Sequence, residues 1–139
     1  MTIPAPVAAW HRIAESRDPA GLDALLADDV VFRSPAVHTP QTGKALTTAY
    51  LSAAVVVLGP TLRYVRQWYA EDSAVLEFEA VLDGLTVHGI DMMSWGDDGR
   101  LVEFTVMVRP FKGLQKLIEL MAAQLNDQLS GQSGAQQSP

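Results

Sequence analysis

Hydrophobic residues in the first half of the chain recur every three or four positions, a spacing that lines one face of a helix. The pattern predicts three helices that end near Arg17, Asp28 and Gly59. Asp18-Pro19 marks the start of the second, because aspartate caps helices and proline suits the first helical turn. A short strand is expected over residues 30–34, between the second and third helices.

From Thr61 onward the hydrophobic period changes to two, which is typical of strands. Apolar and acidic residues alternate over residues 76–80, so one face of the predicted sheet contacts water. Asp83-Gly84 is a strong signal for a two-residue hairpin, and the strands should form an antiparallel meander. The predicted strands span residues 62–70, 74–82, 85–95 and 100–108.

Helices followed by a long meander predict one α+β domain over residues 1–129, in which a curved antiparallel sheet wraps the N-terminal helices around a cone-shaped cavity. After Pro110, apolar residues mark one face of a C-terminal helix. That face closes the cavity as a lid or contacts a second copy of the chain, and the sequence leaves both open. Residues 130–139 contain only Ser, Gly, Gln, Ala and Pro, so a disordered tail is expected there.

The chain carries 16 acidic and 10 basic residues among 139, for a formal net charge of −6. Such a surface repels phosphate backbones, so nucleic-acid binding is not expected. No apolar segment is long enough to span a membrane and no basic leader is visible, so we expect a soluble cytoplasmic protein. With no cysteine, and with His11, His38 and His88 dispersed, neither a metal nor another cofactor is expected.

Asp91 is the one carboxylate of the predicted strand 85–95. Its sequence neighbours are Ile90, Met92 and Met93, so its charged form would be desolvated unless another group pairs with it. The placement indicates a small-molecule pocket built around a functional acid. The alternative is a structural carboxylate bonded to Trp10, to a backbone amide or to buried water.

Three segments, LLADDVVFRSP, TGKALTTAYL and VHGIDMMSWGDDGRLVEFTVMVRP, occur in a familiar order and spacing. On these segments the chain resembles the nuclear transport factor 2-like superfamily, which includes ketosteroid isomerases, SnoaL-like polyketide cyclases and limonene epoxide hydrolases. The resemblance covers nearly the whole chain before the tail. It implies a cone-shaped α+β barrel, a hydrophobic small-molecule ligand and a homodimer formed through the outer face of the sheet.

Compared with the ketosteroid isomerases, Asp91 matches the protonated aspartic acid of the oxyanion hole, which apolar surroundings keep neutral. Their general-base aspartate corresponds to Ser34, which cannot by itself take a proton from carbon. Their oxyanion tyrosine corresponds to Trp10, which has an indole N–H donor but no hydroxyl. The match to classical steroid isomerisation is therefore incomplete.

The resemblance to the polyketide cyclases is looser and implies a cavity with a single aspartate as general acid/base, a role for Asp91. His38, on the loop between Pro35 and Pro40, is expected to assist at the cavity mouth. The epoxide hydrolases use two aspartates bridged by an arginine, but Val106 stands near the position of their last-strand carboxylate.

Two functions follow from these residues. The first is an isomerase- or lyase-type enzyme acting on a hydrophobic carbonyl compound, with Asp91 as general acid/base or oxyanion donor. The second is a non-catalytic ligand-binding or assembly module with the same fold. The expected substrate-binding residues, whose large apolar members are equally explained as core, are Trp10, Phe32, Ser34, Tyr50, Trp68, Phe78, Met93 and Phe104.

The other two histidines are assigned no chemistry. His88 differs from Asp91 by an odd number of residues, which places it on the opposite face of a regular strand, against Glu77, Glu79 or a partner subunit. A bulge at Gly89 would reverse that placement. His11 is expected to face solvent.

Overall fold

The computed structural model describes the backbone of residues 2–137 and the side chains of residues 2–130. The helical elements are α1 (Ala5–Ser16), a 3-10 turn η1 (Pro19–Gly21), α2 (Leu22–Leu25), α3 (Lys44–Leu58) and α4 (Phe111–Gln137). The strands are β1 (Leu26–Arg33), β2 (Gln41–Thr42), β3 (Arg63–Tyr69), β4 (Ser73–Leu82), β5 (Leu85–Trp95) and β6 (Leu101–Arg109).

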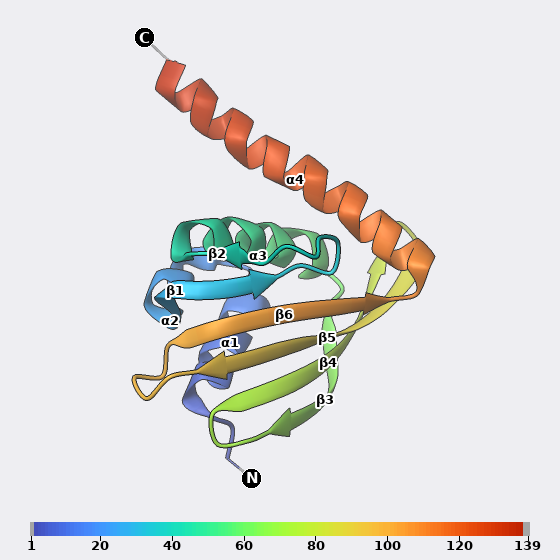
Figure 1. The fold of residues 1–139 in the computed structure, drawn as a ribbon. Helices are drawn as coiled ribbons and strands as arrows, with labels where there is room; N and C mark the ends of the chain where they lie inside the picture. Colours follow the sequence, from blue (N-terminus) through green and yellow to red (C-terminus); the bar gives the residue numbers. More distant parts are fainter. Residues whose placement is uncertain (1, 138–139) are drawn as a thin grey trace.

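The strands of this part of the chain form one curved sheet in the order β2-β1-β6-β5-β4-β3. Helices α1, α2 and α3 lie against its concave face, and α4 leaves the end of β6 and runs outward past α3 (Figure 1). The sheet does not close, so β2 and β3 are its edges. This is the α+β architecture with a C-terminal helix that the sequence predicts.

The meander from β3 to β6 is antiparallel, as predicted. The register between β4 and β5 runs without a shift from Ser73↔Ser94 to Leu82↔Leu85. The turn that joins them has φ values of 48° at Asp83 and 79° at Gly84, the left-handed conformations of a tight hairpin. Because no bulge interrupts this pair, the alternation of its side chains between the two faces holds along its whole length.

The second predicted helix is shorter than expected. Asp18 caps the 3-10 turn η1 at its start, since its Oδ1 accepts a hydrogen bond of 3.0 Å from the Ala20 N–H, and the α2 helix that follows ends at Leu25. Strand β1 begins at Leu26, rather than at Val30, because Leu26 already pairs with β6. This pairing is parallel, which local alternation does not predict, so the sheet is mixed.

Helix α4 also differs from its predicted bounds. Its backbone is helical to Gln137, and so includes most of the segment for which the sequence predicts a disordered tail. Residues 138 and 139 of the predicted tail lie outside the described residues.

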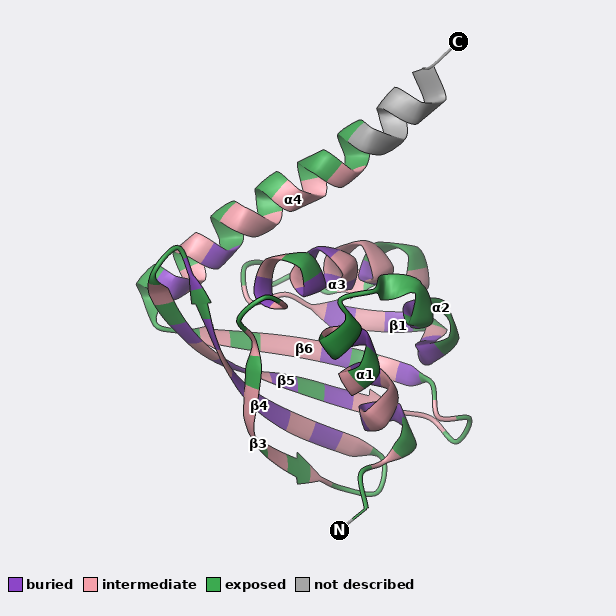
Figure 2. Cartoon of the chain, turned by 180° about the vertical axis from the view of Figure 1, so that it is seen from behind, coloured by how far each residue is buried: buried purple, intermediate pink, exposed green. Residues whose placement is uncertain are grey.

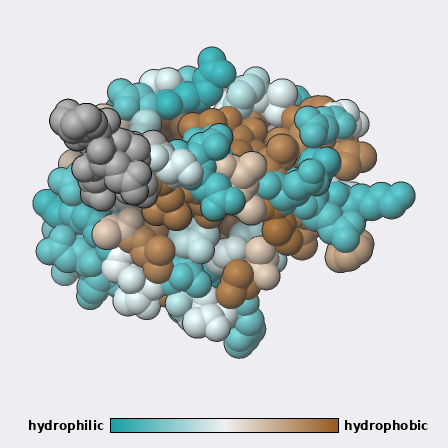
Figure 3. Space-filling model, turned by 90° about the horizontal axis from the view of Figure 1, so that it is seen from above, coloured by the Kyte–Doolittle hydropathy of each residue, from teal (hydrophilic) through white to brown (hydrophobic). Residues whose placement is uncertain are grey.

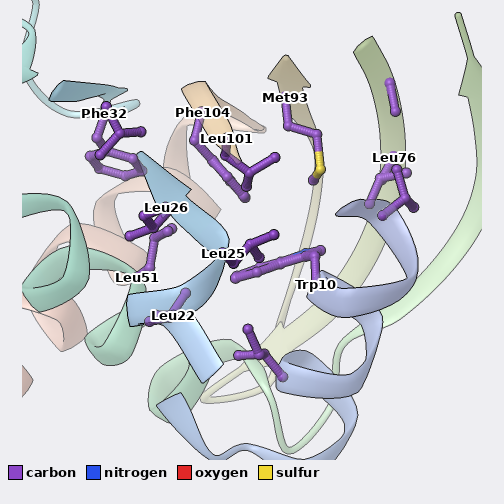
Figure 4. Packing of buried hydrophobic residues seen from close by; sticks show 14 of the residues in the cluster. Trp10, Leu22, Leu25, Leu26, Phe32, Leu51, Leu76, Met93, Leu101 and Phe104 are labelled. Atoms are coloured by element: carbon purple, nitrogen blue, oxygen red, sulfur yellow. The ribbon is translucent and has the colours of Figure 1, made fainter. Parts of the chain in front are cut away.

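The core lies between the helices and the concave face of the sheet. Buried and more exposed residues alternate along the strands that carry it (Figure 2). Trp10 projects from α1 into a cluster with Leu76, Met93 and Phe104 from three strands (Figure 4). A second cluster, around Phe78, joins the sheet to the start of α4. The two clusters leave a cavity between the helices and the sheet.

Gly89 provides the first test of this packing. A Cβ at this position would lie 2.7 Å from Phe78 Cζ and closer still to the Met107 carbonyl oxygen, which is backbone and cannot rotate away. We expect Gly89→Ala to reduce the free energy of unfolding by about 1–3 kcal/mol, measured by urea denaturation. Gly96→Ala in the next turn is the control, because its nearest neighbour is 3.5 Å away. Equal stability of the two variants would contradict this packing.

Candidate functional site

A cavity of about 280 Å³ lies between the concave face of the sheet and the helices. Its volume is at the small end of the range for ligand pockets, and its lining is mostly aliphatic and aromatic. Helix α3 contributes Tyr50, Leu51, Ala54, Val55 and Leu58, and α4 contributes Leu117, Ile118, Met121, Ala122 and Leu125.

The loop after β1 forms another part of the rim, through residues 34–37. Val37 on this loop is 47% exposed and Ile118 on α4 is 40% exposed, although both contribute to the lining. Viewed from the side of α3 and α4, the surface carries hydrophobic patches between polar side chains (Figure 3). The stripe on α4 that the sequence predicts as a lid or a dimer contact thus includes part of the cavity wall.

Asp91 lies in this wall and carries the one carboxylate among the lining residues that the structure describes. It is 5% exposed and sits in the middle of β5, opposite Leu76 of β4 and Val106 of β6. The uninterrupted alternation of β5 turns Asp91 toward the cavity and its neighbours Ile90 and Met92 toward the outer face. The carboxyl group is therefore buried against apolar side chains, as its sequence context predicts.

Two aromatic side chains accompany the carboxyl group. The Tyr64 hydroxyl donates a hydrogen bond of 2.6 Å to Asp91 Oδ2. The Trp10 indole N–H donates one of 2.7 Å to the Tyr64 oxygen. No described residue bonds to the second carboxyl oxygen, Oδ1. Trp10, Tyr64 and Asp91 come from α1, β3 and β5, so three separate elements meet at this point of the cavity.

Tyr64 is a site residue that the sequence prediction missed. Alternation from Leu62 places it on the cavity side of its strand, and both residues line the cavity. The position of its phenol on the inner face of a predicted strand could therefore have identified Tyr64 as a cavity residue. What the sequence did not show is that Tyr64, rather than Trp10, contacts Asp91 directly.

Burial is the main influence on the ionisation of this pair. It raises the pKa of Asp91 from 3.8 to about 7, and the hydrogen bond from Tyr64 opposes that rise. Burial, followed by the nearby charge of Asp91, raises the pKa of Tyr64 well above its usual range. Near neutral pH Asp91 therefore exists in both protonation states, while Tyr64 keeps its proton.

Several predicted ligand-contacting residues do line the cavity, and others do not. Phe78 and Met93 are buried in the core but are not part of the lining. The prediction for Trp68 is wrong, because its side chain lies on the outer face, 51% exposed, beneath the guanidinium of Arg66. Those that line it are Trp10, Phe32, Ser34, Tyr50 and Phe104.

The reason for the wrong placement of Trp68 is a bulge in β3. Tyr64 pairs with Phe78 and Arg66 pairs with Glu77, so β3 advances two residues while β4 advances one. The extra residue, Val65, exchanges the faces of every side chain that follows it.

The structure does not bring His38 together with Asp91. His38 is exposed on the loop after β1 and is not a lining residue. The prediction that His11 faces solvent is also wrong. The His11 ring is half-buried beside the Tyr64 ring, with centroids 5.5 Å apart, and burial lowers its pKa.

His88 lies on the outer face of the sheet and contacts Glu77, one of the alternatives that the sequence predicted. His88 Nε2 is 2.6 Å from Glu77 Oε2, and Arg66 forms an ion pair with the same carboxylate. Hydrogen bonds from Arg66 and then His88 lower the pKa of Glu77 to about 2. This charged cluster is separated from the cavity by the sheet itself.

Two further observations concern cofactors and membranes. Within the described residues, no three side chains of the metal-binding types gather closely enough to hold an ion. In the same part of the chain, none of the helices combines the length and apolarity that crossing a bilayer requires.

The curved open sheet and the cavity enclosed by its helices define a nuclear transport factor 2-like protein. Residues 7–104 match the SnoaL-like domain family, and the chain belongs to that family. None of the curated proteins matches the sequence.

Solved structures with the same fold include close and distant relatives. A steroid delta-isomerase from Pseudomonas aeruginosa is 41% identical, with a TM-score of 0.86 and coverage of 91% of this chain and 93% of that one. A conserved bacterial protein from Silicibacter pomeroyi, described as having a cystatin-like fold, is 27% identical, with a TM-score of 0.81 and coverage of 88% and 86%. An NTF2-like protein of Mesorhizobium loti shares the fold at 24% identity, with a TM-score of 0.66 and coverage of 76% and 91%.

The raised pKa of Asp91 predicts a pH-dependent stability. Between about pH 4 and pH 7 the unfolded chain ionises Asp91 and the folded protein does not, so the free energy of unfolding falls as pH rises through this window. Asparagine does not titrate. We therefore expect Asp91→Asn to gain stability relative to the unmodified protein on going from pH 4 to pH 8, by on the order of 4 kcal/mol.

Urea denaturation at several pH values measures this difference. Asp97→Asn, in the exposed turn between β5 and β6, is the control for the loss of one carboxylate. A stability difference between Asp91→Asn and the unmodified protein that stays constant over pH would contradict the buried, protonated carboxyl.

Proposed function

We propose that this protein is a cofactor-independent isomerase of uncharged hydrophobic carbonyl compounds, with Asp91 as the general acid/base. The observation that carries the proposal is a single carboxyl group, with a pKa of about 7, in the wall of an apolar cavity. A general base works best when its pKa lies near the operating pH. The steroid delta-isomerase relative, at 41% identity, supports the same class of reaction.

In the proposed reaction, ionised Asp91 removes a proton from the carbon next to a carbonyl group. The C–H bond breaks, its electron pair forms an enolate, and the proton resides on Asp91. The carboxyl group then returns the proton to a different carbon of the conjugated enolate, so the double bond moves and the carbonyl re-forms. Atoms and electrons balance within the substrate and Asp91, and no external oxidant or reductant is required.

This assignment differs from the ketosteroid isomerase pattern, in which a separate aspartate is the base and the residue matching Asp91 is a neutral donor. Ser34 corresponds to that base, and within the part of the chain that the structure describes no carboxylate other than that of Asp91 lines the cavity. Asp91 is therefore the group available to remove a proton. The alternative role, a neutral Asp91 that donates a hydrogen bond to the substrate oxygen, suits a ligand that enters the cavity at a pH below 7.

The cavity lining also limits the charge that a substrate can carry. Among the described residues that form it there is no lysine, arginine or histidine, so an anionic substrate would lose its hydration without gaining an ion pair. Ser34 accepts a hydrogen bond of 3.0 Å from the Ala36 N–H, which leaves its own hydroxyl proton free. Ser34 and Tyr50, whose ring stacks on Phe32, are the proposed donors to the carbonyl oxygen.

A non-catalytic binding module is the second candidate. Ser34 in place of a second acid favours it, because the cavity then lacks one of the two catalytic aspartates of the ketosteroid isomerase pattern and could still hold a ligand. The homodimer and the cytoplasmic location both stay predictions. For the dimer, the outer sheet face offers the exposed side chains of Trp68, Met92 and Met107 beside the charged cluster around Glu77.

Turnover of β,γ-unsaturated ketones, with a 3-ketosteroid among them, tests the proposal through the ultraviolet absorption of the conjugated product. We expect kcat/KM to rise with pH through about 7, as Asp91 ionises. Asp91→Asn should lower kcat/KM by about 10²–10⁴-fold, because the general base is lost. Asp97→Asn should match the unmodified protein.

Full turnover by Asp91→Asn would rule out the catalytic role. Calorimetric binding of the ketones by the unmodified protein, with no turnover of any of them, would instead identify a binding module.

A further inference from the structure

The hydrogen bonds that link Trp10, Tyr64 and Asp91 run in one direction. An indole nitrogen can only donate, so the 2.7 Å contact between Trp10 Nε1 and the Tyr64 oxygen occupies a lone pair of that oxygen. The Tyr64 hydroxyl has one proton, and its remaining close partner is Asp91 Oδ2 at 2.6 Å. A tyrosine at position 10 could donate a hydrogen bond to the Tyr64 hydroxyl or accept one from it, whereas the indole of Trp10 can only donate.

We infer that Trp10 is a positioning residue. By donating to the Tyr64 oxygen it keeps the Tyr64 hydroxyl proton directed at Asp91 Oδ2, so that Asp91 exchanges protons with a ligand through Oδ1. The part of this inference that concerns the ligand rests on the proposed function. Since Oδ2 always accepts from Tyr64, the proton of neutral Asp91 must reside on Oδ1. A single carboxyl oxygen thus serves as both the acid and the base.

The surroundings of Oδ1 agree with this role. Asp91 lines the cavity, and no described residue bonds to Oδ1. Within the described part of the chain, the fully buried side-chain nitrogen and oxygen atoms that lack a partner are His11 Nε2 and Thr47 Oγ1, so Oδ1 is not sealed inside the protein. The open space beside it is the cavity.

Other titratable groups that face this chain of hydrogen bonds are few. From α1, the His11 ring lies beside the Tyr64 ring, with Glu15 near it. The described side chains of α3, α4 and the loop after β1 bring no charge to the cavity. His11 is therefore the group whose titration has to be separated from that of Asp91.

Nuclear magnetic resonance of the indole N–H groups tests the hydrogen-bond chain without any substrate. In protein labelled with ¹⁵N-tryptophan, the Trp10 resonance should shift with pH at the midpoint of the Asp91 titration, because the ionised carboxylate strengthens both hydrogen bonds. The resonance of the exposed Trp68 should not follow that midpoint. Asp91→Asn should abolish the Trp10 shift, whereas His11→Asn should leave it. A Trp10 resonance that does not respond to Asp91 would overturn the inference.

Variants of Trp10 give a second readout. Trp10→Phe frees the Tyr64 hydroxyl to rotate and to accept a hydrogen bond from neutral Asp91, so the pKa of Asp91, followed by its ¹³C carboxyl resonance, should rise. Tyr64→Phe should raise it further. Val7→Ala, which removes buried volume from the same helix but no N–H donor, should destabilise the protein and leave the Asp91 pKa in place. An unchanged Asp91 pKa in folded Trp10→Phe would also overturn the inference.

These outcomes separate the inference from the proposed function. If the Trp10 resonance follows the Asp91 titration while Asp91→Asn keeps full turnover, the hydrogen-bond chain stands and the isomerase proposal fails. If Asp91→Asn loses turnover but the Trp10 resonance does not follow the Asp91 titration, the isomerase proposal stands and the inferred role of Trp10 is wrong. In an active protein, the midpoint of the pH profile of kcat/KM should rise in Trp10→Phe together with the Asp91 pKa.

Discussion

The hydrogen bond from the Tyr64 hydroxyl to Asp91 Oδ2 stabilises a carboxyl group that the surrounding apolar side chains would otherwise destabilise. The main features of the fold serve this contact. Alternation from Leu62 turns Tyr64 inward, the regular β5 turns Asp91 to the same side, and α1 brings Trp10 within 2.7 Å of the phenol. The remaining wall is apolar, which keeps the ionised and neutral forms of Asp91 close in energy at neutral pH.

Where strand pairing is regular, the alternation of apolar and polar residues correctly predicted the face of the sheet on which each side chain lies. From 73 to 94 the register between β4 and β5 has no shift, so counting residues was enough to place Asp91 on the cavity side and His88 on the other. The position of Asp91 and most of the aromatic lining could thus be predicted from the sequence, because period-two alternation and turn residues are local properties.

Features that depend on distant parts of the chain could not be predicted in this way. The bulge after Tyr64 sent Trp68 to the outer face, and nothing in the local pattern marks Val65 as the extra residue. The parallel pairing of β1 with β6 joins Phe32 to Phe104, two residues about half the chain length apart. His38 looked suitable because it lies on a loop beside the cavity, but chain proximity does not fix the direction of a side chain.

Glu77 and Asp91 lie one residue apart in the β4–β5 register, since Leu76 pairs with Asp91 and Glu77 pairs with Ile90. Their pKa values are nevertheless about 2 and about 7. One carboxyl is held as an anion by hydrogen bonds from Arg66 and His88 on the outer face, and burial in the apolar interior keeps the other near its midpoint at neutral pH. A single layer of backbone therefore acts as a partition between two electrostatic environments. Substitutions of the charged residues on the outer face therefore change the surface that other molecules contact, but leave the pKa of Asp91 largely unaltered.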